Sequence, residues 1–150
     1  MLQANYKIVK ETDTKAILGL YLQAGWWQSG DRDEDLDIIA KIVANSFCFV
    51  IATVDDKIVG MGRAISDGIS DAYIQDVTVQ KDFRGQGIGK GIMRTLVNFL
   101  KEQNLKWIGL ISEPGYENFY TGLGFKAVSY THLRAHETPE HLVCRLLLDK

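Results

Sequence analysis

Apolar residues along this chain recur with two periods, one typical of helices and the other typical of strands. Where they recur every three to four residues we expect amphipathic helices, and these cover residues 14–22, 35–43 and 92–100. Where they alternate or form short β-branched runs we expect strands, and these cover residues 6–9, 47–54, 57–66, 73–79 and 107–111. Helices and strands share the chain without repeats or linkers, which predicts one domain of the α/β or α+β class.

Polar residues mark several boundaries of these elements. Asp13 or Thr14 precedes the first helical run and is suited to cap it. Asp55 and Asp56 separate two apolar runs, a pattern typical of a β-hairpin. Residues 26–31 interrupt the helical pattern, so we expect a loop there.

The most informative segment is Arg-Gly-Gln-Gly-Ile-Gly-Lys at residues 84–90, between a predicted strand and a predicted helix. Such a turn leaves backbone N–H groups without partners and adds the positive end of the helix dipole. Glycines keep side chains away from these groups, so a phosphate can reach them directly. Arg84 and Lys90 add positive charge at the edges. The segment predicts a diphosphate site, and an ordinary glycine-rich turn is the alternative.

Two common phosphate loops do not fit this segment. A P-loop would need glycine in place of Arg84 and Ser or Thr in place of Gly91. A dinucleotide-binding fingerprint fails because its last glycine position holds another residue in either register. The pattern that fits is Arg/Gln-x-x-Gly-x-Gly/Ala, with Arg84, Gly87 and Gly89 in the defined places. Placed after a strand that ends Val-Thr-Val, it resembles the acetyl-CoA loop of the GNAT acetyltransferase superfamily.

A second motif follows the predicted strand at 107–111. Residues 117–125, Glu-Asn-Phe-Tyr-Thr-Gly-Leu-Gly-Phe, resemble the Phe-Tyr-x-x-x-Gly-Phe segment of the same superfamily. We expect Pro114 to start a short helix here and Gly122 or Gly124 to end it. The resemblance is strongest over residues 74–125.

The resemblance implies an α/β (α+β) fold with a mixed, mostly antiparallel central sheet and helices on both faces. It also implies acetyl-CoA as co-substrate, without a metal. A bulge in the strand at 73–79 would open its main chain, which would bond the pantetheine amides and polarise the thioester carbonyl. A plain strand without a bulge is the alternative. The implied cofactor-binding residues are Val77, Val79, Arg84, Gly85, Gln86, Gly87, Ile88, Gly89, Lys90 and Asn118.

Two catalytic roles follow from the same resemblance. Tyr120 matches the superfamily's Phe-Tyr pair, and we expect its phenol to protonate the departing coenzyme A thiolate. Packing beside Phe119 is the alternative. The base that deprotonates the amine is Asp76, Glu113 or an ordered water, and we rank Asp76 first because it lies on the strand that faces the acyl group.

The resemblance places the acceptor under the first two helices and the loop between them. We expect Trp26 and Trp27 to wall an aromatic pocket there and Glu113 to attract the acceptor's ammonium. The alternative is that one of the two tryptophans belongs to the core. A small primary amine is the expected acceptor, and an amine of a protein is the alternative.

Composition excludes several other classes of protein. The net charge of −2 over 150 residues gives no reason to expect a nucleic-acid partner. No apolar stretch is long enough to span a bilayer, so we expect no membrane partner. The first residues lack the apolar core of a signal peptide and the two cysteines lie far apart, so we expect a cytoplasmic location. The three histidines lie at positions 132, 136 and 141 without a clear metal-ligand pattern, and we expect no metal.

The chain divides into an expected N-acetyltransferase domain, residues 1–128, and an atypical C-terminal tail, residues 129–150. The superfamily continues with a strand that completes the sheet edge, but the tail shows little strand alternation. Thr138 and Pro139 favour a helix N-terminus, with a helix that reaches Leu147. The tail also resembles translated sequencing-adapter sequence. Our hypothesis is that roughly its last twenty residues are not native.

The leading hypothesis is an N-acetyltransferase that moves acetyl from acetyl-CoA to a primary amine by direct attack on the thioester. A second hypothesis is an acyl-CoA-binding or sensing module of the same fold without turnover, because fold and function are separable. A third is an unrelated nucleotide-binding protein. The sequence leaves the oligomeric state open, with a homodimer among the alternatives.

Overall fold

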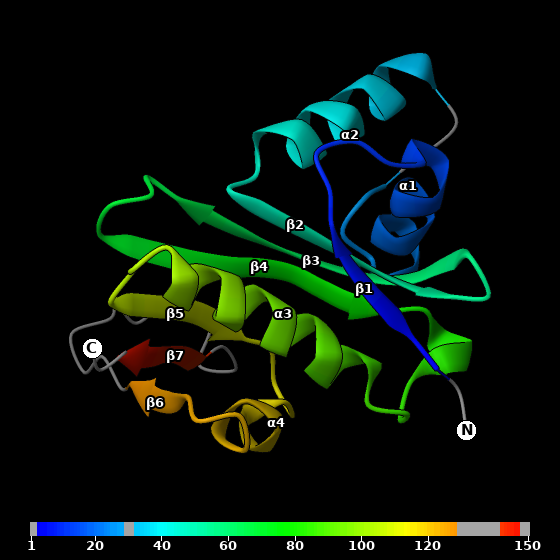
Figure 1. Cartoon of the computed structure of the whole chain (residues 1–150). Helices are drawn as coiled ribbons and strands as arrows, with labels where there is room; N and C mark the ends of the chain where they lie inside the picture. Colours follow the sequence, from blue (N-terminus) through cyan, green and yellow to red (C-terminus); the bar gives the residue numbers. More distant parts are fainter. Residues whose placement is uncertain (1–2, 29–31, 129–141, 148–150) are drawn as a thin grey trace.

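The computed structural model describes residues 3–28, 32–128 and 142–147 and arranges their strands in one seven-stranded sheet (Figure 1). The strand order is β1-β2-β3-β4-β5-β7-β6. Within this sheet β4 and β5 form the parallel pair and the other neighbours are antiparallel, which confirms the predicted mixed, mostly antiparallel architecture. The strands are β1 (Asn5–Ile8), β2 (Cys48–Val54), β3 (Lys57–Ser66), β4 (Asp71–Val79), β5 (Trp107–Ser112), β6 (Lys126–Val128) and β7 (Leu142–Leu147).

Helices cover both faces of the sheet, as expected (Figure 1). They are α1 (Thr14–Gln23), α2 (Asp33–Asn45), α3 (Ile88–Glu102) and α4 (Glu117–Thr121), with a 3-10 turn, η1 (Lys81–Phe83), before the glycine segment. The carboxylate of Asp13 accepts hydrogen bonds from the amides of Lys15 and Ala16, which confirms the predicted cap of α1. No helix in the described ranges combines the length and the apolar character needed to cross a bilayer.

Strand β2 shows how the sheet separates two cores. Successive side chains of a strand point to opposite faces. Cys48, Val50 and Ala52 accordingly pack in the core that contains α3. Phe49 and Ile51 pack in the core beneath α1 and α2. Because both faces are covered, β2 is buried along its whole length.

The predicted hairpin joins β2 to β3 through Asp55 and Asp56. Both residues have positive φ angles, 51° and 65°. This is the geometry of a type I′ turn, whose twist matches that of the flanking strands. The hairpin prediction is therefore confirmed.

Strand β4 carries the bulge that the resemblance implied. Gln75 pairs with Arg63 and Thr78 pairs with Met61, so two residues of β4 lie opposite one residue of β3. A bulge bends its strand and increases the local twist. Strand β4 pairs with β5 only through its first four residues, 71–74. The two strands part from there, and the space between their C-terminal ends is open to a ligand.

Two predicted boundaries are wrong. Residues 142–147 form β7 between β5 and β6 instead of a helix, because pairing with two neighbours outweighs local helix propensity. Helix α4 begins at Glu117, because Pro114 and Gly115 form a turn in which Gly115 has a φ of 90°. The left-handed glycine after α4 is Gly124, with a φ of 100°. The rest of the predicted C-terminal helix and the end of the predicted loop at 26–31 lie outside the described residues.

Candidate active site

The glycine segment forms a left-handed turn at the N-terminus of α3. Gly85 and Gly87 have φ angles of 77° and 84°, and no described atom outside the glycine and its two chain neighbours lies within 4 Å of the position where a Cβ would stand on either one. The amides of residues 85–90 donate no backbone hydrogen bond within the described part of the chain, and the first such bond of the helix runs from Gly91 to Gly87. Successive unpaired amides in a left-handed turn form an anion-binding concavity.

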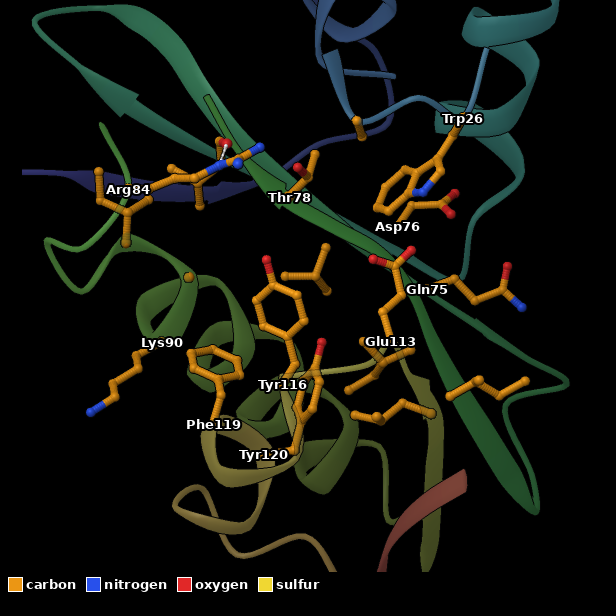
Figure 2. Close-up of a pocket in the computed structure, with 18 of the residues that line it drawn as sticks. Trp26, Gln75, Asp76, Thr78, Arg84, Lys90, Glu113, Tyr116, Phe119 and Tyr120 are labelled. Carbon is orange, nitrogen blue, oxygen red and sulfur yellow. Dashed lines mark hydrogen bonds between the residues drawn. The ribbon is translucent and has the colours of Figure 1, made fainter. Parts of the chain in front are cut away.

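Two cations flank this turn. The Arg84 Nε donates a hydrogen bond of 2.9 Å to the carbonyl of Val79, which ties the start of the turn to the end of β4. One lone pair of the Val79 carbonyl, a predicted partner of the cofactor, is therefore already occupied. Lys90 is exposed, and its side chain extends outward from α3 (Figure 2). Together with the helix dipole, these charges favour an anion at the turn.

A cavity of about 1030 Å³ extends from this turn along the bulge of β4 to the far ends of α1 and β5. Most of the predicted site residues line it. They are Trp26, Asp76, Val77, Val79, Arg84, Gly85, Gly87, Ile88, Gly89, Lys90, Glu113 and Tyr120. The parting of β4 from β5 thus brings the predicted cofactor, catalytic and acceptor residues to one continuous space.

Tyrosines near α4 form one wall of the cavity. Tyr120 makes edge-to-face ring contacts with Phe119, at 5.0 Å between centroids, and with Phe125, at 6.2 Å. Tyr116 also lines the cavity and is half exposed. Figure 2 shows both tyrosine side chains pointing from the α4 side toward β4. Sequence reasoning missed Tyr116, although its position four residues before Tyr120 on a helical segment predicts a shared face.

The family model of an acetyltransferase (GNAT) domain matches residues 37–137 of this chain. The chain belongs to the GNAT acetyltransferase family. Its members are acyltransferase enzymes that use acetyl-CoA as co-substrate, which agrees with the unpaired amides and the cavity described above.

Two similar plant proteins support membership of the GNAT family. The chain is 38% identical over 73 residues to the GCN5-related N-acetyltransferase 2, chloroplastic, of Arabidopsis thaliana, a match that covers 49% of this chain and 28% of the relative. It is 37% identical over 67 residues to the serotonin N-acetyltransferase 2, chloroplastic, of Oryza sativa subsp. japonica, which covers 45% of this chain and 34% of the relative. The matches thus span about a third of the length of these relatives.

Solved structures share the fold over nearly the whole chain. The ribosomal-protein-S18-alanine N-acetyltransferase of Escherichia coli superimposes with a TM-score of 0.75, covering 99% of this chain and 96% of that chain. The sequence identity is 14%, so the likeness concerns the fold alone.

Three predicted site residues of this GNAT domain are not among the residues that line the cavity. Trp27 donates its Nε1–H to Asp35 Oδ1 at 3.3 Å, is partly buried and packs against the core beneath α1 and α2, so it is the core-facing tryptophan of the pair. Gln86 and Asn118 are exposed, and neither contributes to the cavity wall formed by the described residues. Trp26, in contrast, is 39% exposed and lines the cavity.

Asp76, our first-ranked base, is held by two donors. Its Oδ2 accepts a hydrogen bond from Tyr21 Oη and another from Arg63 Nε, each at 2.7 Å. Burial, followed by the bond to Asp76, raises the pKa of Tyr21 above its ordinary value, so the phenol stays protonated as the donor. Two donors of the protein therefore occupy Oδ2 of Asp76.

Glu113 differs from Asp76 in its surroundings. It is exposed at the end of β5, and it forms no ion pair with another described residue. Its side chain points into the cavity toward the Asp76 side (Figure 2). Glu113 is therefore the carboxylate that is available to an acceptor amine or to a water beside it. In the described ranges, no group of three or more His, Cys, Asp or Glu side chains is placed to hold a metal.

Proposed function

We propose that this GNAT enzyme transfers the acetyl group of acetyl-CoA to the primary amine of a small molecule with an apolar body. The observation that carries the proposal is the single cavity that joins the unpaired amides of the glycine turn to Tyr120 and Glu113. One end suits a diphosphate, the other end suits a cation, and the bulged strand lies between them.

Acetyl-CoA lies with its diphosphate on the amides of residues 85–90 and its pantetheine arm along the bulged part of β4. The amine nitrogen attacks the thioester carbonyl, so a C–N bond forms while the C–S bond breaks. A main-chain N–H at the bulge stabilises the charge that develops on the carbonyl oxygen. Tyr120 donates a proton to the departing thiolate, and Glu113, directly or through a water, accepts the proton that the amine loses.

The acceptor end of the cavity favours a monoamine over a polyamine. Of the described lining residues, only Asp76 and Glu113 are acidic, and Asp76 is paired with Arg63. One available carboxylate matches one ammonium group. Apolar surface surrounds it, because Trp26, Tyr73 and Ile111 line the cavity and are 39%, 46% and 66% exposed. An arylalkylamine combines these two features, with cation–π attraction as an additional contribution.

The names of similar proteins include both kinds of acceptor. The rice relative is named for serotonin, a small arylalkylamine. The Escherichia coli structure is named for an alanine of a ribosomal protein. An apolar monoamine agrees with the composition of the cavity wall, so it is the acceptor we propose. A cytoplasmic location stays a prediction from the sequence.

The test is coenzyme A thiol release from acetyl-CoA with tryptamine, phenethylamine, spermidine and a peptide that begins with alanine. We expect kcat/KM for tryptamine or phenethylamine to exceed that for spermidine and for the peptide at least tenfold. A preference for the peptide would replace the proposed acceptor with a protein. Tight acetyl-CoA binding without thiol release for any amine would instead favour a binding module.

A further inference from the structure

Asp76 adopts a backbone conformation that residues other than glycine rarely adopt. Its φ is 59°, in the left-handed region, and it is one of the two bulge residues of β4. Asparagine, aspartate and glycine visit this region most readily, and β-branched residues avoid it. A residue in this conformation persists when its surroundings fix it in place.

Side chains from two other elements fix Asp76 on the cavity side. Tyr21 from α1 and Arg63 from β3 both donate to its Oδ2 at 2.7 Å. The Arg63 and Asp76 side chains are only 18% and 24% exposed, so water competes weakly for this pair. Arg63 is held in turn by Ser46 Oγ and Gln75 Oε1, each at 3.4 Å.

Close packing fixes the bulge from the other side. Gly62 of β3 lies opposite the two bulge residues. A Cβ on Gly62 would stand 2.7 Å from Ile92 Cγ2 and 3.1 Å from Val77 Cγ2. Helix α3 and Val77 therefore fill this space, and the bulge has no room to flatten toward α3.

We propose that Tyr21, Arg63 and Asp76 form a bulge clamp, which positions the main chain at Val77 against the thioester carbonyl. Asp76 is then a positioning residue and does not act as the general base. This inference rests on the proposed function, because Val77 lines the cavity in which the acetyl group would lie.

The clamp also connects the cofactor and acceptor ends of the site. Tyr21 is 4% exposed, and its ring contacts that of Trp26 edge to face at 6.3 Å. Figure 2 shows Trp26 beside Asp76 at the cavity wall. The position of the acceptor wall and the conformation of the bulge are therefore set by the same buried phenol.

A substitution series at position 76 separates positioning from base catalysis. Glycine and asparagine accept a left-handed φ, alanine does so at a cost, and valine resists it. We therefore expect kcat with acetyl-CoA and tryptamine to fall by less than about fivefold in Asp76→Asn, which keeps an acceptor oxygen for Tyr21 and Arg63 as well as the left-handed φ. It should fall roughly 5- to 30-fold in Asp76→Gly and Asp76→Ala, which lose both hydrogen bonds of the clamp, and further in Asp76→Val, which also resists the left-handed backbone.

The pH profile is the second readout of this series. The charged or titratable groups that face Asp76 are Tyr21 from α1, Arg63 from β3 and Glu113 across the cavity. A positioning residue leaves the acid limb of kcat in place in Asp76→Asn, whereas removal of a base eliminates it. Equal loss of kcat in all four variants, together with loss of the acid limb, would overturn the proposal.

A third readout does not depend on any acceptor. We would measure the infrared carbonyl band of acetyl-CoA labelled with ¹³C at the carbonyl, bound to each variant at saturation. Wild type and Asp76→Asn should shift the band to lower wavenumber by similar amounts, and Asp76→Val should lose most of the shift. A full shift in folded Asp76→Val would overturn the clamp. Absence of turnover with a normal band shift in the wild type would affect only the proposed function.

Tyr21→Phe tests the clamp without changing the backbone of β4. We expect a loss of roughly 3- to 10-fold in kcat, since one hydrogen bond to a charged group is removed. Tyr6→Phe is the matched control, because Tyr6 packs over Gly91 on α3 and does not line the cavity. Thermal unfolding of each variant identifies any that fail to fold, and the Asn and Ala variants provide the comparison if the Val variant does not fold. Equal kcat in Tyr21→Phe and Tyr6→Phe would contradict the clamp.

Discussion

Gly87→Ala separates the stability of the glycine turn from its role in binding coenzyme A. Gly87 precedes α3 with a φ of 84°, and no described atom outside Gly87 and its two chain neighbours lies within 4 Å of a Cβ built there. Steric collision therefore contributes nothing to the loss of stability in Gly87→Ala. A left-handed backbone costs alanine about 1–2 kcal/mol. Alanine also restricts the unfolded chain more than glycine does, which offsets about 0.4–1 kcal/mol of this cost.

The net loss in the free energy of unfolding is then about 1 kcal/mol, equivalent to a Tm lower by about 2–4 °C for a chain of this size. The effect on binding should be larger. If the turn relaxes and one amide loses a charged phosphate, about 1.5–3 kcal/mol is lost, which weakens the binding of coenzyme A and raises its Kd roughly 10- to 150-fold.

Calorimetric titration with coenzyme A and a thermal melt measure the two effects on one sample. Gly19→Ala is the matched control, because Gly19 lies within α1 and has open space around its Cβ position. In the control, the melting temperature should rise slightly and the Kd should not change. A Gly87→Ala protein with a lowered Tm and an unchanged Kd would refute a diphosphate site at the turn.

Three further predictions concern the catalytic wall, the acceptor end and the core. If Tyr120 is the proton donor, Tyr120→Phe should lower kcat at least 100-fold and Tyr116→Phe less than tenfold, as measured by thiol release at saturating substrates. Equal losses in the two variants would contradict the assignment. Glu113→Gln should raise the KM for tryptamine about tenfold or more while the Kd for acetyl-CoA stays constant, because a charge beside the ammonium is removed. Burial raises the pKa of the Cys48 thiol to about 11, so the thiol is protonated at neutral pH in the folded protein. The contribution of this pKa shift to folding stability is present below the ordinary thiol pKa and is lost as pH rises toward 11. At pH 8, peptide mapping should find no iodoacetamide label on Cys48 until the protein unfolds. Labelling of the folded protein would contradict this prediction.

The parts of the site that are local in sequence could be predicted from it. The glycine turn and the hairpin at Asp55 and Asp56 depend on short-range backbone preferences, and both appear where the pattern indicates. The hydrogen-bond partners of Asp76 could not be predicted in this way, because Tyr21 lies 55 residues away in the chain and Arg63 lies 13 residues away. No periodicity encodes such contacts.

The sequence also could not show which of two neighbouring residues of the same type faces the cavity and which faces the core. Trp26 and Trp27 are both aromatic residues after α1, but the packing of α1 against α2 directs one to the cavity and the other to the core. Residues 142–147 show the same limit at the level of an element. Their leucines suit a helix, and only the pairing with β5 and β6 makes them a strand.

The most direct measurement is an amide NMR titration of ¹⁵N-labelled protein with coenzyme A and, separately, with pantetheine, which lacks the diphosphate. We predict that coenzyme A moves the amide resonances of Gly85, Gly87 and Gly89 strongly downfield and that pantetheine leaves them in place. Largest shifts elsewhere in the chain, or equal responses to the two ligands, would contradict a diphosphate bound at the mouth of α3.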